Sequence, residues 1–147
     1  MDYNRRSFET SKIRSWYNVS RFNWVAKKLD DYAAKKRIIE LGFYDGRILN
    51  HIQKENLQYY HGYDANWEGG LLIAKENNED NDIVFSQCTE ANQLNLNEKF
   101  NVFISLETLE HMPDDDLKDY LFEIKKFYIY NHFIAFIVPA TILNVAH

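Results

Sequence analysis

The chain has 147 residues with 10 Tyr, 10 Phe and 3 Trp but only 5 Gly and 2 Pro, which excludes a disordered tail and predicts one ordered domain. Its single cysteine excludes an internal disulfide framework and a cysteine-rich zinc site, and it favours a reducing, cytoplasmic location. The formal net charge of −5 argues against broad nucleic-acid binding, and no apolar run approaches the ~20 residues that span a bilayer.

Charge is unevenly distributed along the chain. Residues 1–36 carry nine Lys or Arg against four Asp or Glu, whereas residues 37–147 carry eight against eighteen. The basic segment could contact an anionic substrate, but a solvated helical face lying against the acidic body is the favoured interpretation. We predict a basic arm or lid over residues 1–21 and one α/β domain over residues 22–147. Trp16, Tyr17 and Arg21 could form a lid, but packing in the core is the favoured interpretation of the two aromatic residues.

Apolar spacing predicts helices and strands that alternate along the chain. Phe22, Val25, Leu29 and Tyr32 recur at helical spacing, which predicts an amphipathic helix over residues 22–36. The other predicted elements are strands over 37–42, 57–64, 82–86, 100–106 and 132–138, and helices over 45–55, over 67–77 with a first turn weakened by glycines, and from 114 onward. Apolar strands between amphipathic helices predict an α/β, doubly wound parallel sheet.

The stretch 37–46, Arg-Ile-Ile-Glu-Leu-Gly-Phe-Tyr-Asp-Gly, is the centre of the predicted site. A short apolar strand ends at an acid, Gly42 allows a sharp turn, and Asp45 or Gly46 begins the next helix. Backbone N–H groups at such a turn face a crevice that a nucleotide-like ligand can approach closely. A plain strand-to-helix turn is the alternative interpretation of Gly42.

Three segments, in order, resemble the class I S-adenosylmethionine-dependent methyltransferase superfamily, in particular its small-molecule branch. Residues 38–46 resemble its first motif, an acid followed by alternate glycines. Gly62-Tyr63-Asp64 resembles the acid at the end of the second strand, and residues 100–114 resemble the fourth-strand motif with its Leu-Glu-His and Pro-Asp continuation. The resemblance covers residues 22–140 and implies a Rossmann-like sheet of about five strands in the order 3-2-1-4-5.

The resemblance also implies S-adenosylmethionine as the cofactor, a small-molecule acceptor and a set of site residues, without a metal. Glu40 would bond near the cofactor's ammonium group, Asp64 would accept both ribose hydroxyls, and His111 would face the substrate mouth as the candidate catalytic base. The implied cofactor-binding residues are Glu40, Gly42, Phe43, Tyr44, Gly46, Asp64, Thr89, Glu90, Ser105 and Leu106. Thr89 stands where an acid near the adenine amine is expected, so Glu90 could substitute for it.

Structural interpretations of the same side chains stay open. Glu40 could serve as a cap or an ion-pair partner, Asp64 could initiate the following helix, and His111 could simply begin a loop. His61 and His132 lie in strand patterns and are predicted to be packed or edge residues, since no cluster of side chains has metal-ligand spacing.

Two departures from the family pattern support a second hypothesis. Tyr44 stands where the family places its middle glycine, and the sequence continues only eight residues past Pro139, without the family's last two strands. Strand 132–138 would then lie at an open edge, where a second copy could pair with it. The alternative function is therefore a shortened, catalytically silent module that binds a protein partner or self-associates. A nicotinamide-binding domain is disfavoured because the first turn lacks its three-glycine spacing.

Overall fold

The computed structural model describes residues 12–32, 35–129 and 134–138, and their strands form one parallel sheet in the order β3-β2-β1-β4-β5. Every neighbouring pair of strands is parallel. The strands are β1 (Lys36–Leu41), β2 (Leu57–Asp64), β3 (Ile83–Gln87), β4 (Val102–Leu106) and β5 (Ile134–Val138). The predicted fold class and strand order are confirmed, and within the described residues no strand follows β5.

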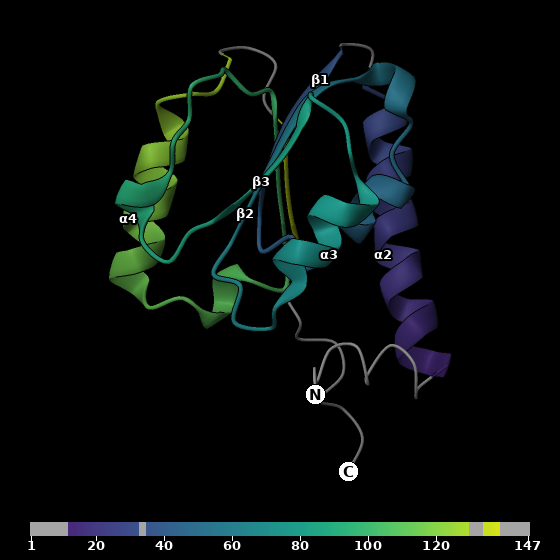
Figure 1. Cartoon of the computed structure of the whole chain (residues 1–147), viewed down its shortest axis with the longest axis horizontal. Coiled ribbons are helices and arrows are strands. Elements are labelled where there is room, and N and C mark those ends of the chain that lie inside the picture. The colour runs from purple at the N-terminus through teal and green to yellow at the C-terminus, as the bar shows by residue number, and fades with distance from the viewer. Residues whose placement is uncertain (1–11, 33–34, 130–133, 139–147) are drawn as a thin grey trace.

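In the part of the chain that the structure describes, three α-helices cover the two faces of the sheet, which makes three layers (Figure 1). Helix α4 (Asp114–Lys125) lies on one face, and α2 (Lys12–Asp30) and α3 (Gly70–Asn77) lie on the other. Short 3-10 helices occupy the connections: η1 (Arg47–Asn50), η2 (Lys54–Asn56), η3 (Ala91–Gln93) and η4 (Leu109–His111).

Alternation of side chains along the central strands builds a separate apolar core on each face. In β1, Ile38 packs with the α2 side and Ile39 packs with the α4 side, and both are fully buried. Strands buried on both faces read as nearly continuous apolar runs, as β4 does here. Burial of these residues on both sides fixes the register of the central strands.

A side chain ties β1 to β4 at the end of the sheet opposite the carboxyl ends. The Asn101 side-chain oxygen Oδ1 accepts the backbone N–H of Arg37 at 2.8 Å, and the side-chain nitrogen Nδ2 donates to the Lys35 backbone carbonyl at 3.0 Å. Arg37 and Asn101 are 64 positions apart in sequence. This buried amide therefore sets the pairing between two strands that are distant along the chain.

Helix α2 differs from its prediction at both ends. It begins at Lys12 rather than residue 22 and ends at Asp30 rather than residue 36. The sequence before Gly42 contains no Gly or Pro, so no helix-breaking residue prevents α2 from extending from residue 22 toward the N-terminus. Acids at positions 30 and 31 oppose the helix dipole, which favours an end near Asp30. The predicted division after residue 21 therefore falls inside α2, and the division itself stays a prediction.

The predicted helix over 45–55 is wrong, because only η1 and η2 form there. Gly46 adopts a left-handed φ of 72°, and Gln53 is extended, so each interrupts an α-helical path. Ile48, Leu49 and Ile52 are nevertheless buried, which satisfies the apolar pattern that suggested a helix. Helix α3 begins only at Gly70, after the weak first turn of its predicted range.

The prediction that Trp16 packs in the core is also wrong, since 71% of its surface is exposed. His61 is packed as predicted: it is buried, and its Nε2 lies 2.8 Å from the Ser86 hydroxyl. Residue 132 and Pro139 lie outside the described residues.

Candidate functional site

A cavity of about 680 Å³ lies at the carboxyl ends of β1, β2 and β4, where parallel α/β sheets bind their ligands. Eight of the predicted site residues line it: Glu40, Gly42, Phe43, Tyr44, Asp64, Thr89, Leu106 and His111. Gly46, Glu90 and Ser105 do not. The remaining lining residues are Tyr17, Arg21, Phe22, Leu41, Asp45, Arg47, Ile48, Tyr63, Ala65, Trp67, Glu68, Cys88, Glu107, Thr108, Met112, Pro113, Asp116 and Tyr120.

The turn after β1 requires glycine at position 42. Gly42 has φ of +80°, and a Cβ added there would lie 1.8 Å from the Thr108 hydroxyl oxygen. Its N–H donates to the Tyr63 carbonyl at 2.8 Å, which continues the pairing of β1 with β2 into the turn. The glycine therefore allows the loop after β4 to pack directly against the turn, on the floor of the cavity.

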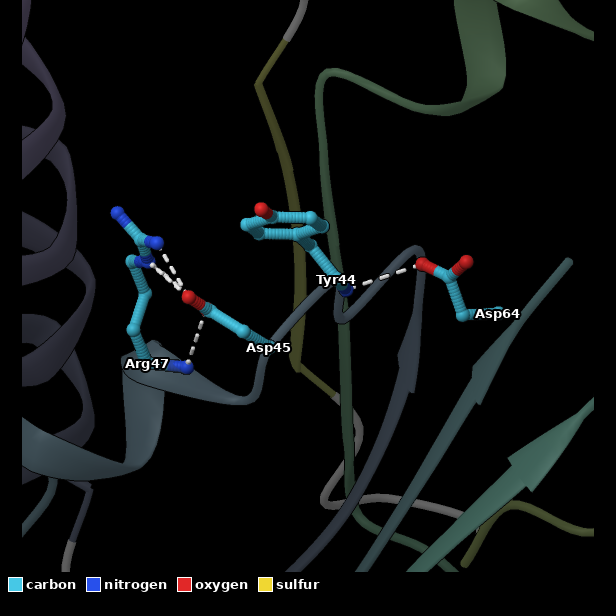
Figure 2. A network of polar contacts seen from close by, with 4 residues as sticks. All are labelled: Tyr44, Asp45, Arg47 and Asp64. Atoms are coloured by element: carbon cyan, nitrogen blue, oxygen red, sulfur yellow. Dashed lines mark hydrogen bonds and ion pairs between the residues drawn. The ribbon is translucent and has the colours of Figure 1, made fainter. Parts of the chain in front are cut away.

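Tyr44 occupies a backbone conformation that suits glycine. Its φ is +53°, and its N–H donates to Asp64 Oδ2 at 2.9 Å (Figure 2). The guanidinium carbon of Arg47 lies 5.4 Å from the centroid of the Tyr44 ring, within the range of a cation–π contact. The turn thus keeps the shape expected for a glycine, and Tyr44 lines the cavity.

Asp64 receives one backbone hydrogen bond on each carboxylate oxygen. Oδ2 accepts from Tyr44, and Oδ1 accepts from the Asn66 N–H at 2.6 Å. Burial raises the pKa of Asp64, and the Asn66 bond opposes that rise. Because a carboxylate offers about four lone-pair positions, about two remain for a ligand. Both the structural and the binding interpretation of Asp64 are therefore compatible with its geometry.

Asp45 and Arg47 form a local ion pair beside the turn (Figure 2). Arg47 Nε donates to the two Asp45 oxygens at 2.7 and 3.0 Å, and its Nη2 contacts Oδ2. Both side chains line the cavity. The pair holds the Arg47 guanidinium next to the Tyr44 ring.

Glu40 is the most deeply buried acid of the site, with 3% of its surface exposed. Burial raises the pKa of Glu40 to about 8, and the neighbouring carboxylates of Asp64 and Asp45 add to the rise. The Tyr60 hydroxyl donates to Glu40 Oε2 and opposes it. Burial and the Glu40 charge also raise the pKa of Tyr60, so this pair exists near neutral pH without a full negative charge.

Thr89 and Glu90 have different roles, because Thr89 lines the cavity whereas Glu90 caps a short helix. Thr89 lines the cavity and donates from its backbone N–H to Gln93 Oε1 at 2.7 Å. Glu90 forms a reciprocal capping box with Gln93 at the start of η3. The Glu90 carboxylate thus has a structural partner outside the cavity, and its contact with an adenine amine stays a prediction.

The residues after β4 reach the cavity unequally. Leu106 is buried and lines it, whereas Ser105 is buried outside it and its hydroxyl has no hydrogen-bond partner among the described residues. His111 ends η4, is exposed, and lines the cavity. Its backbone N–H donates to the Thr108 carbonyl at 3.1 Å.

Helix α2 supplies a wall that the motif reasoning did not include. Tyr17, Arg21 and Phe22 line the cavity, and Arg21 forms an ion pair with Glu107. The Arg21 guanidinium carbon lies 5.1 Å from the Tyr17 ring centroid. The spacing of Tyr17 and Arg21 by four residues places them on one helix face, which is the signal available in the sequence. The position of Arg21 next to Glu107 depends on the tertiary fold, which the helical spacing does not predict.

Within the described residues, no group of three or more His, Cys, Asp or Glu side chains is placed to hold a metal ion. None of the described helices combines the length and apolar character needed to cross a membrane.

No protein-family model and no curated protein matches the sequence. Solved structures do match. The methyltransferase domain of bacterial CtHen1-C aligns with a TM-score of 0.63 at 21% identity, over 75% of this chain and 60% of that one. The CcbJ methyltransferase from Streptomyces caelestis aligns with a TM-score of 0.60 at 18% identity, over 78% of this chain and 47% of that one.

CalS10 from Micromonospora echinaspora, an amino pentose methyltransferase solved with SAM bound, aligns with a TM-score of 0.63 at 10% identity, over 82% of this chain and 50% of that one. The chain thus spans about half to three fifths of the length of these structures. Strand order, helix placement and these alignments together show that the chain has the fold of the class I S-adenosylmethionine-dependent methyltransferases.

Proposed function

We propose that the cavity binds S-adenosylmethionine and that the protein transfers its methyl group to a small-molecule acceptor. The observation that carries the proposal is the bond between the Tyr44 N–H and the Asp64 carboxylate, which joins the turn after β1 to the end of β2. Those are two of the three segments that resemble the superfamily. The SAM-bound structure of CalS10, which shares this fold, supports the same ligand.

The residues present fit such a ligand. A cavity of about 680 Å³ falls within the ~300–1,000 Å³ that is usual for small-molecule sites. Asp64 keeps acceptor capacity for two ribose hydroxyls after its two backbone bonds. Glu40, at the end of β1, supplies a carboxyl group whose raised pKa would fall again beside a cationic group.

The chemistry demands little of the protein beyond placement. When bound, S-adenosylmethionine would supply a methyl group activated by its positively charged sulfur, and transfer would leave the electron pair of the broken carbon–sulfur bond on sulfur. The chain's own residues have to hold the acceptor in line and exclude water. Phe43, Leu106 and Met112 give the cavity apolar surface for that purpose, and His111 could accept a proton from a hydroxyl acceptor.

Calorimetric titration of the purified protein with S-adenosylmethionine, and separately with S-adenosylhomocysteine, tests the proposal. Micromolar affinity for either ligand is the expected result. Asp119→Ala removes an acid at an exposed position of α4 outside the cavity, and it is the matched control for Asp64→Ala. It should bind the ligand as the parent protein does. No heat of binding at millimolar ligand from a folded sample would overturn the proposal.

A second candidate function is a catalytically silent module that binds a protein partner or self-associates, and Tyr44 favours it. Tyr44 lines the cavity at a position where the family motif has a glycine. Pairing of β5, the last strand in the sheet order, with a second copy stays part of this candidate. Sedimentation velocity distinguishes a monomeric methyltransferase from a module that self-associates through β5. A stable monomer that binds the cofactor argues against pairing at this edge.

A further inference from the structure

An ion pair crosses the cavity between two elements that are far apart in sequence. Arg21 of α2 contacts the Glu107 carboxylate, which directly follows β4. The Arg21 side chain is 10% exposed and the Glu107 side chain is 33% exposed. Glu107 has φ of +55°, a left-handed conformation that is costly for a residue with a Cβ. Such strain often marks a functional position, because the surrounding fold must hold it in place.

The lining of the cavity is acidic. Among the described residues it includes six carboxyl groups and two guanidinium groups, those of Arg21 and Arg47. Both arginines already face one of these carboxylates, Glu107 and Asp45 respectively. The other acids are Asp64, Glu68 and Asp116, together with Glu40, whose raised pKa removes most of its charge near neutral pH. A charge distribution of this kind attracts a cation and opposes an anionic ligand.

Aromatic rings line the same space. Tyr17 lies under the Arg21 guanidinium, and Trp67 is 86% exposed at the rim of the cavity. Ring faces attract an ammonium group as they attract a guanidinium. The position now held by the Arg21 guanidinium, between a carboxylate and a ring, therefore has the two partners that an organic ammonium needs.

We propose that the methyl acceptor is an amine, and that its ammonium form replaces the Arg21 guanidinium at the Glu107 carboxylate. This inference rests on the proposed function, since it names the substrate class of the same cavity. Before transfer the ammonium would lose one proton to Glu107, which passes it to solvent. The lone pair freed on nitrogen would then form the bond to the methyl carbon as the bond from that carbon to sulfur breaks, with its electron pair left on sulfur. Glu107 is placed for this contact because it follows β4, beside β1, at the switch point of the sheet.

The test compares three probes that share a phenol ring and differ in their polar group: tyramine, tyrosol and 4-hydroxyphenylacetate. Each is titrated into protein saturated with S-adenosylhomocysteine, and its dissociation constant is measured by calorimetry or ligand-observed NMR. Tyramine is expected to bind at least tenfold more tightly than the alcohol or the carboxylate. Equal affinities, or a preference for the carboxylate, would overturn the inference.

Substitution of each partner of the ion pair gives a second, independent readout. Glu107→Gln should abolish the preference for tyramine, whereas Arg21→Gln should strengthen tyramine binding severalfold because the competing cation is gone. A purely structural ion pair would give the same loss in both variants, and an anion site would give the reverse pattern; either result overturns the inference. The comparison of probes on the parent protein stands even where a variant does not fold.

Unchanged affinity of each variant for S-adenosylhomocysteine shows that the cofactor half of the cavity is intact. If the parent protein binds S-adenosylhomocysteine but shows no preference for tyramine, the acceptor class is wrong and the proposed function survives. If it does not bind S-adenosylhomocysteine at all, the proposed function fails and this inference fails with it.

Discussion

The Asp64 carboxylate holds the backbone of Tyr44 through a hydrogen bond of 2.9 Å between residues 20 positions apart. The bond joins the end of β2 to the turn after β1, so one side chain shapes the turn and faces the cavity at once. Stability and ligand affinity are therefore expected to change together when this carboxylate is altered.

Asp64→Ala should lower the free energy of unfolding by about 1–3 kcal/mol, because the N–H groups of Tyr44 and Asn66 lose their acceptors. It should also abolish measurable binding of S-adenosylmethionine. Asp64→Asn is the matched control, since its amide oxygen keeps one acceptor and its loss of stability should be smaller. Urea denaturation and calorimetric titration measure the two effects, and undiminished affinity in the Ala variant would contradict the placement of the ribose.

Tyr44→Gly should be more stable than Tyr44→Ala by about 1 kcal/mol, because only glycine adopts a φ of +53° without strain. Both variants remove the phenol ring and its contact with Arg47, so their difference isolates the backbone term. The Gly variant should bind S-adenosylhomocysteine more tightly than the parent protein if the ring crowds the cofactor. Thermal unfolding and calorimetry decide both points, and weaker binding would mean that the ring contributes a contact.

Glu40→Gln should flatten the dependence of stability on pH. The pKa of Glu40 is about 8 in the fold against 4.5 for a free carboxyl group, so between these values the folded state holds more protons than the unfolded state. The free energy of unfolding from this group therefore falls as pH rises from about 4.5 to 8, by at most ~1.4 kcal/mol per pH unit.

The measurement for Glu40→Gln is urea denaturation at pH 5, 6, 7 and 8 for the parent protein and the variant. The Gln amide can still accept the Tyr60 hydroxyl, so packing is preserved. The variant should gain stability relative to the parent protein as pH rises. Parallel pH profiles would show that Glu40 keeps an ordinary pKa.

Gly42→Ala should destabilise the fold by about 2–5 kcal/mol, through left-handed strain and a collision with Thr108. Gly69→Ala is the control, because Gly69 has a similar φ of +73° but no atom within 4 Å of an added Cβ. Only the strain of about 1–2 kcal/mol should appear there. Similar losses in both variants would show that the Thr108 loop moves aside at little cost.

Local patterns were sufficient to predict the sheet. The second strand is found over Leu57–Asp64 as predicted, because a buried strand bounded by polar residues leaves few alternatives. The segment after Gly42 was mispredicted as a helix because apolar residues at 48, 49 and 52 fit helical spacing as well as they fit two short turns. The backbone conformations of Gly46 and Gln53 favour two short turns over one α-helix. The apolar pattern does not predict these conformations.

The site was predictable where motif residues lie at strand ends, as for Asp64 and Glu40. It was not predictable where contacts join distant segments: the Arg21 and Glu107 pair depends on how α2 crosses the sheet. Glu90 shows a third case, because an acid near a predicted contact is also an ordinary helix cap. Composition does not distinguish these roles, since each requires the same carboxylate.

The tie between Arg37 and Asn101 has a consequence for how the protein folds. β1 pairs early in sequence with β2, but its other neighbour, β4, is reached only after the chain closes a loop of about sixty residues. Contacts of such high sequence separation slow folding, and on the ribosome β1 has to wait for β4 to be synthesised. Pulsed hydrogen exchange should therefore detect protection of β2 amides before β4 amides, with the cavity assembled last.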